Sequence, residues 1–508
     1  MFWFKTRLKA FDLTLRPPRA LRETTFGSGL SGLGHSGNDI SKDYSRVSLL
    51  LVLFFLVFTG NPANAQEKTA DQLTRHGITW KFGRKVPYGQ FVNGDFYVVG
   101  PVTVIDIDPK PENGRNGSVL NPQPNPDKSG YDSRIEAGRY DAGLRSNLPI
   151  DMKPGDALVS AVSVESVGLI KNWLRKSDSS HSPIKSYSVL TCLKERAPAG
   201  AFRPSCSDRE QKIYLSQSLR RNLLPKLAYG KKTFMTDQGP IGLSEFEDHF
   251  NRTWLDVLFF EYDTPVEYMP QYPRELARAV GMASLILMTD LKPEEKEKLL
   301  IGLVQYGIDL WGMVRAGHPG WPAFGGHGSG RKWPIIFAGM MLGDEDMVSP
   351  NTKYPMVKFG EDMQTMYGDC WTGAKVVYAG HLGKDGDKVK KGWGAYEHLR
   401  PGDWPDSQAD HTGGKIEYIG ETYRRCCTGH AWVGEALAAR IMHAEKNWGH
   451  DAFFDYVDRW MTEDDAEFLK IIKRETGKDF SAKFMRQKQS WDPFVNEMWS
   501  KYRHRKLQ

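Results

Sequence analysis

The sequence lacks a hydrophobic run long enough to serve as a permanent membrane span. Its most apolar stretch, Ser48 to Gly60, holds about a dozen apolar residues, whereas a helix that crosses a bilayer needs about 20. A run of this length is typical of the apolar core of a secretory signal, and Ala63 and Ala65 supply the small side chains of an A-x-A cleavage site. The sequence therefore predicts residues 1–65 as a signal or leader segment that is cleaved after Ala65. An uncleaved membrane anchor is the alternative.

Excess basic charge is also missing from the part that follows this leader. The leader holds eight basic and four acidic side chains, so the net charge of +6 for the whole chain falls to +2 after residue 65. A protein that binds nucleic acid usually keeps a strong basic excess or a recognition motif. Nucleic acid is therefore set aside as a partner, and the expected location is the periplasm or the extracellular space.

Cysteine is scarce, and the five cysteines lack the Cys-x-x-Cys or Cys/His spacing of a structural zinc site. An exported protein can form disulfides. Cys192 and Cys206 bracket a loop rich in Pro and Gly, which favours a disulfide between them. The adjacent Cys426 and Cys427 permit a vicinal disulfide, a bridge from one of them to Cys370, or two free buried thiols.

About 440 residues follow the leader, more than one compact core usually holds, so two domains are expected. From Gly77 to about Ile241, short β-branched and aromatic runs alternate with clusters of Pro, Gly and Asn. These runs are Phe96 to Ile107, Ala157 to Ile170 and Ser186 to Leu193. The pattern predicts a β-rich, sandwich-like domain over residues 66–241.

Beyond Leu243 the apolar residues recur with the period of a helix. One helix face is formed by residues three or four positions apart, namely Leu299, Leu303, Tyr306, Leu310 and Val314. Pro273 and Pro293 mark two helix starts, and Gly317 marks a helix end. Long connections rich in Gly, Trp, Tyr and His are typical of loops that carry function. We expect an α/α toroid, or incomplete α/α barrel, over residues 242–508 and hence an α+β multidomain protein.

The most site-like stretch is Gly325 to Pro334, which sets four chemically active side chains among glycines. His327 is a candidate acid or base, and Arg331, with Lys332 and Trp333 beside it, is a candidate for binding a carboxylate. The glycines let the backbone approach a ligand closely, but the Gly-Lys-Ser/Thr of a phosphate loop is absent. The alternative is a glycine-rich start of a helix whose charges face water.

A second group of candidates lies in the stretch KIEYIGETYRRCCTGHAW, residues 415–432. Tyr418 and Tyr423 can act as acid or base if a neighbouring cation such as Arg424 lowers their pKa from about 10. His430 follows on the same stretch. The alternative is that these tyrosines only pack and form hydrogen bonds.

A third group contains His249, Asn251 and Arg252, near the start of the helical part. His249 and Arg252 are three positions apart and therefore share one helix face. A solvated amphipathic face is the alternative for this group.

The long loop after residue 367 holds candidate metal ligands whose spacing matches no metal motif. They are His381, His398, His411, Glu397, Asp403, Asp406 and Asp410. A structural Ca²⁺ that stabilises the loop is the metal expected outside the cell. The sequence predicts no required cofactor.

Three stretches carry a resemblance to known proteins: FVNGDFYVVGPVTV, GGHGSGRKWPIIFAG and YRRCCTGHAWVGEALAARI. With the order of a β part and an α/α part, they resemble a group of secreted proteins from marine and planctomycete-type bacteria over most of the chain. More distantly, in architecture and residue type, the chain is similar to the α/α-toroid polysaccharide lyases that act on alginate or glucuronan. The resemblance implies a secreted lyase that cleaves an acidic, uronate-containing polysaccharide by β-elimination.

In such lyases a Tyr or His removes the proton next to a uronate carboxylate, an Asn, His or Arg neutralises that carboxylate, and a Tyr protonates the leaving oxygen. The resemblance implies His327 or His249 as the base or the neutralising group, and Tyr418 or Tyr423 as the acid/base. It implies that the substrate is bound by the remaining polar and aromatic candidates, namely Arg331, Lys332, Trp333, Asn251, Arg252, Arg424 and His430.

Two other functions stay open on the sequence alone. A glycoside hydrolase on the same scaffold needs two carboxylates about 5 to 10 Å apart, and Asp369, Asp403, Glu417 and Glu421 are available. A non-catalytic carbohydrate-binding protein of the cell envelope is the third reading. The sequence determines neither the polymer nor the oligomeric state.

Overall fold

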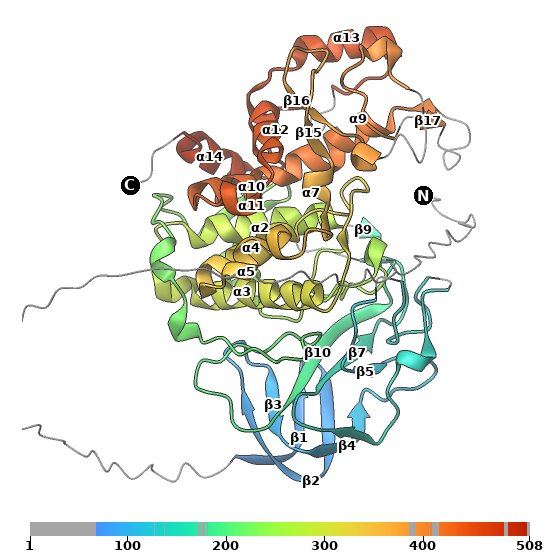
Figure 1. The fold of residues 1–508 in the computed structure, drawn as a ribbon, viewed down its shortest axis with the longest axis vertical. Coiled ribbons are helices and arrows are strands. Elements are labelled where there is room, and N and C mark those ends of the chain that lie inside the picture. Colours follow the sequence, from blue (N-terminus) through green and yellow to red (C-terminus); the bar gives the residue numbers. More distant parts are fainter. Residues whose placement is uncertain are drawn as a thin grey trace, which may run out of the picture. The chain divides into compact units, whose positions relative to one another are not determined.

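The computed structural model describes residues 68–504, apart from 126, 137, 171–173, 175–177, 180, 386–392, 406, 409–415 and 482–485. The predicted leader, residues 1–65, lies outside the described residues. From residue 67 onward the chain forms one compact unit, in which a curled sheet comes first and helices follow (Figure 1). The expected order of a β-rich part and a helical part is confirmed, whereas the toroid and the two-domain division stay predictions.

None of the helices among the described residues is long and apolar enough to cross a membrane.

Eight strands form the curled sheet, and each neighbouring pair is antiparallel except β3 with β10. In spatial order the strands are β5 (Ser118–Leu120), β7 (Ala157–Ser163), β10 (Ile184–Leu193), β3 (Phe96–Val99), β2 (Ile78–Gln90), β4 (Val102–Asp108) and β6 (Ile150–Met152), with β1 (Thr69–Arg75) paired to β2. The three runs that the sequence predicts as strands all contain strands of this sheet.

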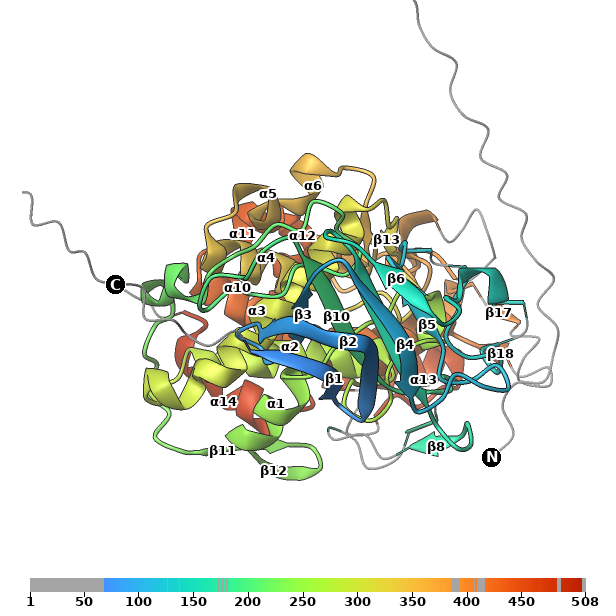
Figure 2. The same cartoon turned by 90° about the horizontal axis from the view of Figure 1, so that it is seen from below.

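The curl of the sheet centres on β2, the longest strand. The first residues of β2 pair with both β1 and β4, Val86 and Pro87 pair with β1, and Tyr88, Gly89 and Gln90 at the end pair with β3. The register with β4 shifts between Lys81 and Phe82, and such an irregularity bends a strand. The two halves of the sheet therefore wrap around a shared apolar interior (Figure 2).

Strand β10 is buried on both faces, with only Lys185 of its residues exposed. Leu190 and Cys192 face the interior of the curled sheet. Tyr187 and Val189, on the opposite face, belong to the same apolar cluster as the helices. Successive side chains of a strand point to opposite faces, so β10 joins the core of the sheet to the core of the helical part.

Helices dominate from Leu243 onward. The longer ones are α1 (Leu243–Phe250), α2 (Pro273–Leu287), α3 (Pro293–Arg315), α4 (Lys332–Leu342), α10 (Gly429–Ile441), α12 (Asp451–Thr462), α13 (Ala466–Thr476) and α14 (Pro493–Tyr502). The short ones are α5 (Glu345–Val348), α6 (Pro350–Lys353), α7 (Gly360–Met363), α9 (Ile419–Tyr423) and α11 (Glu445–Trp448). The helix starts predicted at Pro273 and Pro293 are confirmed. Proline is favoured at the first helical position because the backbone N–H that it lacks would have no partner within the helix there.

Short strand pairs lie outside the main sheet. They are β8 (Leu169–Ile170) with β9 (Asp178–Ser179), β11 (Thr233–Thr236) with β12 (Gly239–Gly242), β13 (Gly320–Trp321) with β14 (Lys358–Phe359), β15 (Thr365–Tyr367) with β16 (Val376–Tyr378), and β17 (Ser407–Gln408) with β18 (Ile416–Glu417).

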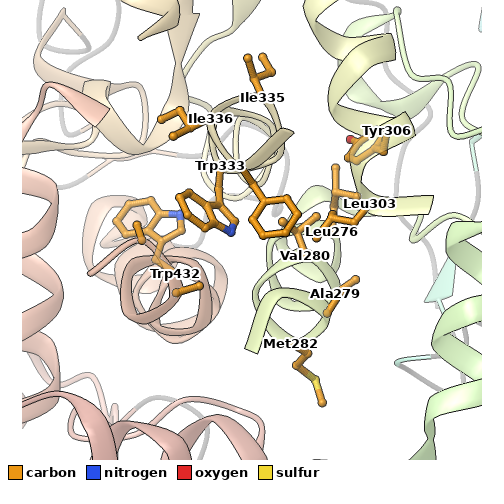
Figure 3. Close-up of a cluster of buried hydrophobic side chains, with 14 of the residues drawn as sticks. Leu276, Ala279, Val280, Met282, Leu303, Tyr306, Trp333, Ile335, Ile336 and Trp432 are labelled. Carbon is orange, nitrogen blue, oxygen red and sulfur yellow. The ribbon is translucent and has the colours of Figure 1, made fainter. Parts of the chain in front are cut away.

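Helices α2, α3, α4 and α10 contribute to one apolar cluster, part of which Figure 3 shows. Trp333 of α4 and Trp432 of α10 are fully buried there. Each indole N–H finds an acceptor, Ser284 Oγ at 2.8 Å for Trp333 and Ser329 Oγ at 3.0 Å for Trp432. A buried indole usually needs such a partner, so both tryptophans are held in one orientation.

The stretch FVNGDFYVVG ties the sheet to the helical part. Asp95, in the turn before β3, is buried and accepts from Arg203 Nε at 2.7 Å. Gln305 of α3 in turn holds the backbone of Arg203, with Gln305 Nε2 3.0 Å from Arg203 O. The stretch FVNGDFYVVG, which carries part of the sequence resemblance, therefore has a structural role.

All five cysteines are free thiols, so the expected Cys192–Cys206 disulfide is wrong. Cys192 belongs to the interior of the curled sheet and Cys206 to the helical core. Cys426 and Cys427 form neither a vicinal disulfide nor a bridge to Cys370, and both are free thiols. Of these two, Cys427 is buried and Cys426 is half-buried.

Candidate functional site

The glycine-rich stretch forms a tight loop against three other segments of the chain. A Cβ on Gly325 would lie 2.2 Å from the ring of Tyr423 and 2.9 Å from the ring of His381. A Cβ on Gly326 would lie 2.7 Å from the hydroxyl of Tyr272. Only glycine fits these contacts, and Gly325 also has a φ of +56°, which favours glycine. The loop therefore brings His327 close to two tyrosines and a second histidine.

The imidazole of His327 is hydrogen-bonded to Glu261, a residue that sequence reasoning missed. His327 Nδ1 lies 2.7 Å from Glu261 Oε1, and their side chains are 18% and 4% exposed. Because an ionised carboxylate only accepts hydrogen bonds, Nδ1 carries the proton. In a neutral ring Nε2 is then the basic nitrogen. The pair therefore has the arrangement of a histidine base oriented by a carboxylate.

Aromatic rings surround the imidazole of His327. The ring centroids of Phe260 and Tyr272 lie 4.9 and 4.8 Å from it, and that of Phe324 lies 5.8 Å away. Burial raises the pKa of Glu261, whereas the neighbouring His327 opposes that rise. The carboxylate and the imidazole thus sit in a largely apolar wall, where their electrostatic interaction is stronger than in water.

The backbone that presents Glu261 is strained. Phe260 and Glu261 both have left-handed φ angles, of 67° and 59°, which cost non-glycine residues free energy and often accompany functional sites. Gln271 Nε2 donates to the carbonyl of Glu261 at 3.0 Å and helps to hold this conformation.

Tyr423, at the end of α9, lies beside His381, with ring centroids 3.9 Å apart. His381 also packs against Phe324 and Trp393, with centroids at 4.5 and 5.0 Å. Tyr423 and His327 are both partly exposed. The structure therefore places Tyr423 against Gly325 of the loop that carries His327, and it adds His381, which the sequence offered only as a metal ligand.

Cys427 lies behind the same loop. Arg274 Nη1 is 3.9 Å from Cys427 Sγ, and the Tyr272 hydroxyl accepts from Gly326 N at 3.1 Å. Burial raises the pKa of the Cys427 thiol, but hydrogen bonds from Cys426 and Tyr272 and the charge of Arg274 outweigh it and lower the pKa to about 6. A thiolate is the nucleophilic form of cysteine.

Arg331, Lys332 and Trp333 do not lie open to a substrate. Arg331 is buried in an ion pair with Asp256, and Lys332 is buried against Asp362. Trp333 belongs to the core. The alternative expectation, a helix start whose charges face water, is right about the helix but wrong about Arg331 and Lys332, since both find acidic partners distant in sequence.

Arg331 instead supports the loop that carries His327. Its Nη1 donates to the carbonyls of His327, at 2.9 Å, and Ser329, at 2.8 Å. With Asp256 as its third partner, Arg331 holds the loop in place rather than facing a substrate.

The second predicted group separates in the same way. Arg424 binds Glu421 with two bonds of 2.9 Å and donates to Gln487 at 2.6 Å, all buried. His430 is buried, with its ring 4.9 Å from that of Trp460. Tyr418 precedes α9 and packs edge-on against Trp404. Of this group, Tyr423 is the residue that the structure places against the His327 loop.

The third predicted group lies at the end of α1. His249 Nδ1 is 2.6 Å from the Glu245 carbonyl, and burial lowers the pKa of His249. Arg252 binds Glu267 at 2.8 Å and stacks on Tyr268. Asn251 follows α1 directly and donates its backbone N–H to Glu247 O, 2.9 Å away. The described contacts of Arg252 are thus with Glu267 and Tyr268 rather than with the residues around His327.

Metal ligands are not gathered among the described residues. No three His, Cys, Asp or Glu side chains come together there as a metal would require. Glu397 is instead bound to Arg459 at 2.9 Å. Asp406, Asp410 and His411 lie outside the described residues, so the structural Ca²⁺ stays a prediction.

Of the carboxylates considered for a hydrolase, the side chain of Glu417 lies outside the described residues, and the other three have separate surroundings. Asp369 is exposed and pairs with Lys375, and Asp403 is exposed on a separate turn. Glu421 is buried; although burial raises its pKa, Arg424 and Arg425 hold that pKa well below the usual range. A carboxyl fixed as an anion cannot serve as a general acid.

A surface hollow lies between β2, β4 and β6. It is lined by Arg84, Thr103 and Asp151 among apolar residues, without a histidine or tyrosine among its lining residues. The chemistry of acid and base catalysis is therefore concentrated at the His327 loop.

Glu261 has a signal in the sequence that was not used. It is a single acidic residue inside the aromatic run Leu258-Phe259-Phe260-Glu261-Tyr262, and an isolated acid in an apolar run is usually buried with a partner. That partner, His327, is 66 residues away, and no local pattern identifies it.

Comparison of the chain with protein-family models, with curated proteins and with solved structures finds no match.

Proposed function

We propose that this chain is a polysaccharide lyase that cleaves a uronate-containing polymer by β-elimination, with His327 as base and Tyr423 as acid. The 2.7 Å contact between His327 Nδ1 and Glu261 Oε1 carries the proposal. It orients the imidazole and stabilises the imidazolium that forms when Nε2 takes a proton. The expected export of the protein and the distant resemblance to α/α lyases support a polysaccharide as substrate.

The chemistry follows from this pair. Nε2 of His327 removes the proton on the carbon next to the uronate carboxylate, and the electrons of that C–H bond spread onto the carboxylate. They then form a carbon–carbon double bond as the glycosidic C–O bond breaks. The leaving oxygen takes a proton from the Tyr423 hydroxyl. Groups that stabilise the negative charge on the carboxylate contribute most to the rate, because this charge is absent from the bound substrate and develops in the transition state.

The two arginines that the resemblance assigns to the substrate carboxylate are not part of this proposal. Arg331 and Arg424 are both buried with Asp256 and Glu421 as partners. Removing Arg331 would leave the buried Asp256 without its cation, and removing Arg424 would leave Glu421 with Arg425 as its remaining cation. We therefore expect their variants to affect folding before catalysis.

The test is the ultraviolet absorbance of the unsaturated uronate product during incubation with alginate, glucuronan, ulvan and glycosaminoglycans. We expect a rising signal with one polymer, and a loss of at least about 100-fold in His327→Ala and Tyr423→Phe, the usual contribution of a general acid or base. Matched controls are His398→Ala and Tyr367→Phe, which change exposed side chains. A flat absorbance with new reducing ends would indicate a hydrolase instead.

A second candidate function uses the same histidine with Cys427 as nucleophile. The lowered pKa of Cys427, about 6, and the neighbouring Arg274 favour it, since a thiolate beside an oriented histidine is the arrangement of acyl-transfer enzymes. Hydrolysis of an activated ester that is lost in Cys427→Ser, with no unsaturated sugar formed, would select this function over the lyase.

A further inference from the structure

Two carboxyl groups face each other in the interior beneath the His327 loop. Glu361 of α7 and Glu435 of α10 are both fully buried, and their carboxyl groups lie close enough to interact with each other. Glu361 Oε1 accepts the backbone N–H of Gly330 at 2.6 Å. Glu361 Oε2 and both oxygens of Glu435 receive no N–H or O–H from other groups in the described part of the chain.

Two ionised carboxylates cannot make this contact. An ionised carboxylate only accepts hydrogen bonds, so one of the two must carry a proton to form a bond between them. Burial of a second, unpaired negative charge would cost far more free energy than protonation. Burial raises the pKa of both groups, that of Glu361 to about 7 and that of Glu435 well above its ordinary value.

The charges around the pair do not replace that proton. Asp362, on α7, adds further negative charge. Lys332, at the start of α4, is bound to Asp362, and Arg331, just before α4, is bound to Asp256. The backbone of α10 beside Glu435 packs against Gly281 of α2, which carries no charge.

We propose that Glu361 and Glu435 share one proton, with Glu435 donating to Glu361, and that this bond is a positioning device for the turn that leads from His327 to Gly330. The shared proton is inferred from the burial and proximity of the two carboxyl groups, whereas its relevance to catalysis rests on the proposed function. Both residues act through the loop and do not touch the reacting atoms.

The connection to the loop has two parts. Glu361 Oε1 holds Gly330 N, and Gly360, the residue before Glu361, packs directly on Gly328: a Cβ on Gly360 would lie 2.8 Å from Gly328 Cα. Ionisation of the second carboxyl would drive α7 and α10 apart. The Gly328–Gly330 turn would move with α7, and the support under His327 would loosen.

The first test is urea unfolding between pH 4 and 8 of the wild type, Glu435→Gln, and Glu467→Gln, a control that removes the same charge from an exposed site. A raised pKa in the folded state means that stability is full below the ordinary Glu pKa and is lost as the pH rises. Glutamine donates the same hydrogen bond without titrating. Relative to Glu435→Gln, the unfolding constant of the wild type should therefore rise by up to about tenfold per pH unit between about pH 5 and 7, the slope for one proton.

Two results would overturn the shared proton. One is a ratio of the unfolding constants of the wild type and Glu435→Gln that does not change over this pH range. The ratio for the wild type and the control Glu467→Gln should not change in either case. The other is stabilisation of the wild type, but not of Glu435→Gln, by added Ca²⁺, since a cation would then bridge the two carboxylates. Neither result depends on the enzyme having the proposed activity.

The second test follows the position of the loop through amide hydrogen exchange of the peptide that contains Phe324 to Arg331. Glu435→Ala should speed its exchange about tenfold, the effect of losing a hydrogen bond of about 1.4 kcal/mol, and Glu435→Gln should restore the wild-type rate. Equal rates in all three proteins would refute the positioning role. If activity is found, rescue of kcat by Gln but not by Ala is expected.

Discussion

Arg203 and Asp309 form a two-pronged ion pair in the interior, with Nη1 3.0 Å from Oδ1 and Nη2 2.5 Å from Oδ2. Asp309 lies on α3, and the same guanidinium binds Asp95 next to strand β3. All three side chains are at most 6% exposed. The contact therefore joins the helical part to the curled sheet without help from water.

Loss of this arginine should destabilise the whole chain. Arg203→Met leaves the buried Asp309 without its cation and leaves Asp95 with Arg75 alone, and breaking a buried pair in this way costs about 3–5 kcal/mol. Urea unfolding measures the change. Lys375→Met removes the exposed pair with Asp369 and should change stability by less than about 1 kcal/mol. Equal, small effects of both substitutions would contradict the structural role of Arg203.

Helices α2 and α10 cross at two glycines, and a single methyl group should disturb the crossing. A Cβ on Gly281 would lie 2.8 Å from the backbone of Gly434 and Glu435. Gly281→Ala is expected to cost about 1–3 kcal/mol, as overpacking usually does. Gly168→Ala, where no atom lies within 4 Å of the added Cβ, is the control. Thermal unfolding of both variants measures the difference, and equal melting temperatures would contradict the close crossing.

Asp263 should make stability fall as the pH rises. Burial, aided by the charge of Asp256, raises its pKa to about 7, so its contribution is full below the unfolded pKa and is lost between about pH 4 and 7. Asparagine can still accept from Leu258 N, 3.0 Å away. Asp263→Asn should gain up to about 4 kcal/mol over the wild type at pH 8, and nothing at pH 4.

The same substitution at an exposed aspartate has the opposite sign. Backbone N–H groups of Gly230 and Tyr229 lower the pKa of Asp290, so this residue stabilises the fold above the unfolded pKa, and the effect is lost as the pH falls. Asp290→Asn should therefore be less stable than the wild type at pH 8. A gain in both variants would show that removal of negative charge, and not burial, decides the outcome.

The sequence predicts the elements of this fold better than their long-range pairings. The helix starts at Pro273 and Pro293 and the strand in Ser186 to Leu193 follow from local rules, so they were predictable. The disulfide between Cys192 and Cys206 was expected from a nearby loop, yet the two thiols belong to different cores. Sequence spacing does not reveal which of the two cores a cysteine side chain enters, because that depends on which face of the strand packs against the distant helices.

The candidate site shows the same limit. His327 and Tyr423 were identified by residue type, because few other side chains perform acid and base chemistry near neutral pH. Glu261 was missed, and Arg331 and Lys332 were expected at the surface or at the substrate. Their partners Asp256 and Asp362 lie 75 and 30 residues away in sequence, and only the folded chain brings these charges together.

Cys427 should react with iodoacetamide at a lower pH than the other buried cysteines. Its pKa is lowered to about 6, whereas burial raises those of Cys206 and Cys192 to about 11 and 12. Mass spectrometry of alkylated peptides should show labelling with a midpoint near pH 6 for the peptide that holds Cys427. Cys426→Ser should keep this midpoint and Cys427→Ser should lose it. A midpoint above about pH 8 would contradict the thiolate.

The central claim is that His327, oriented by Glu261, drives β-elimination. The most direct test is mass spectrometry of the products formed in water enriched in oxygen-18, with the wild type and Glu261→Gln compared. The account predicts unsaturated products that contain no oxygen-18, formed at least about 10-fold more slowly by Glu261→Gln, because the imidazolium loses its charged partner. Saturated products that carry one oxygen-18 at the new reducing end only would contradict it, since they would show that water, and not elimination, cleaves the glycosidic bond.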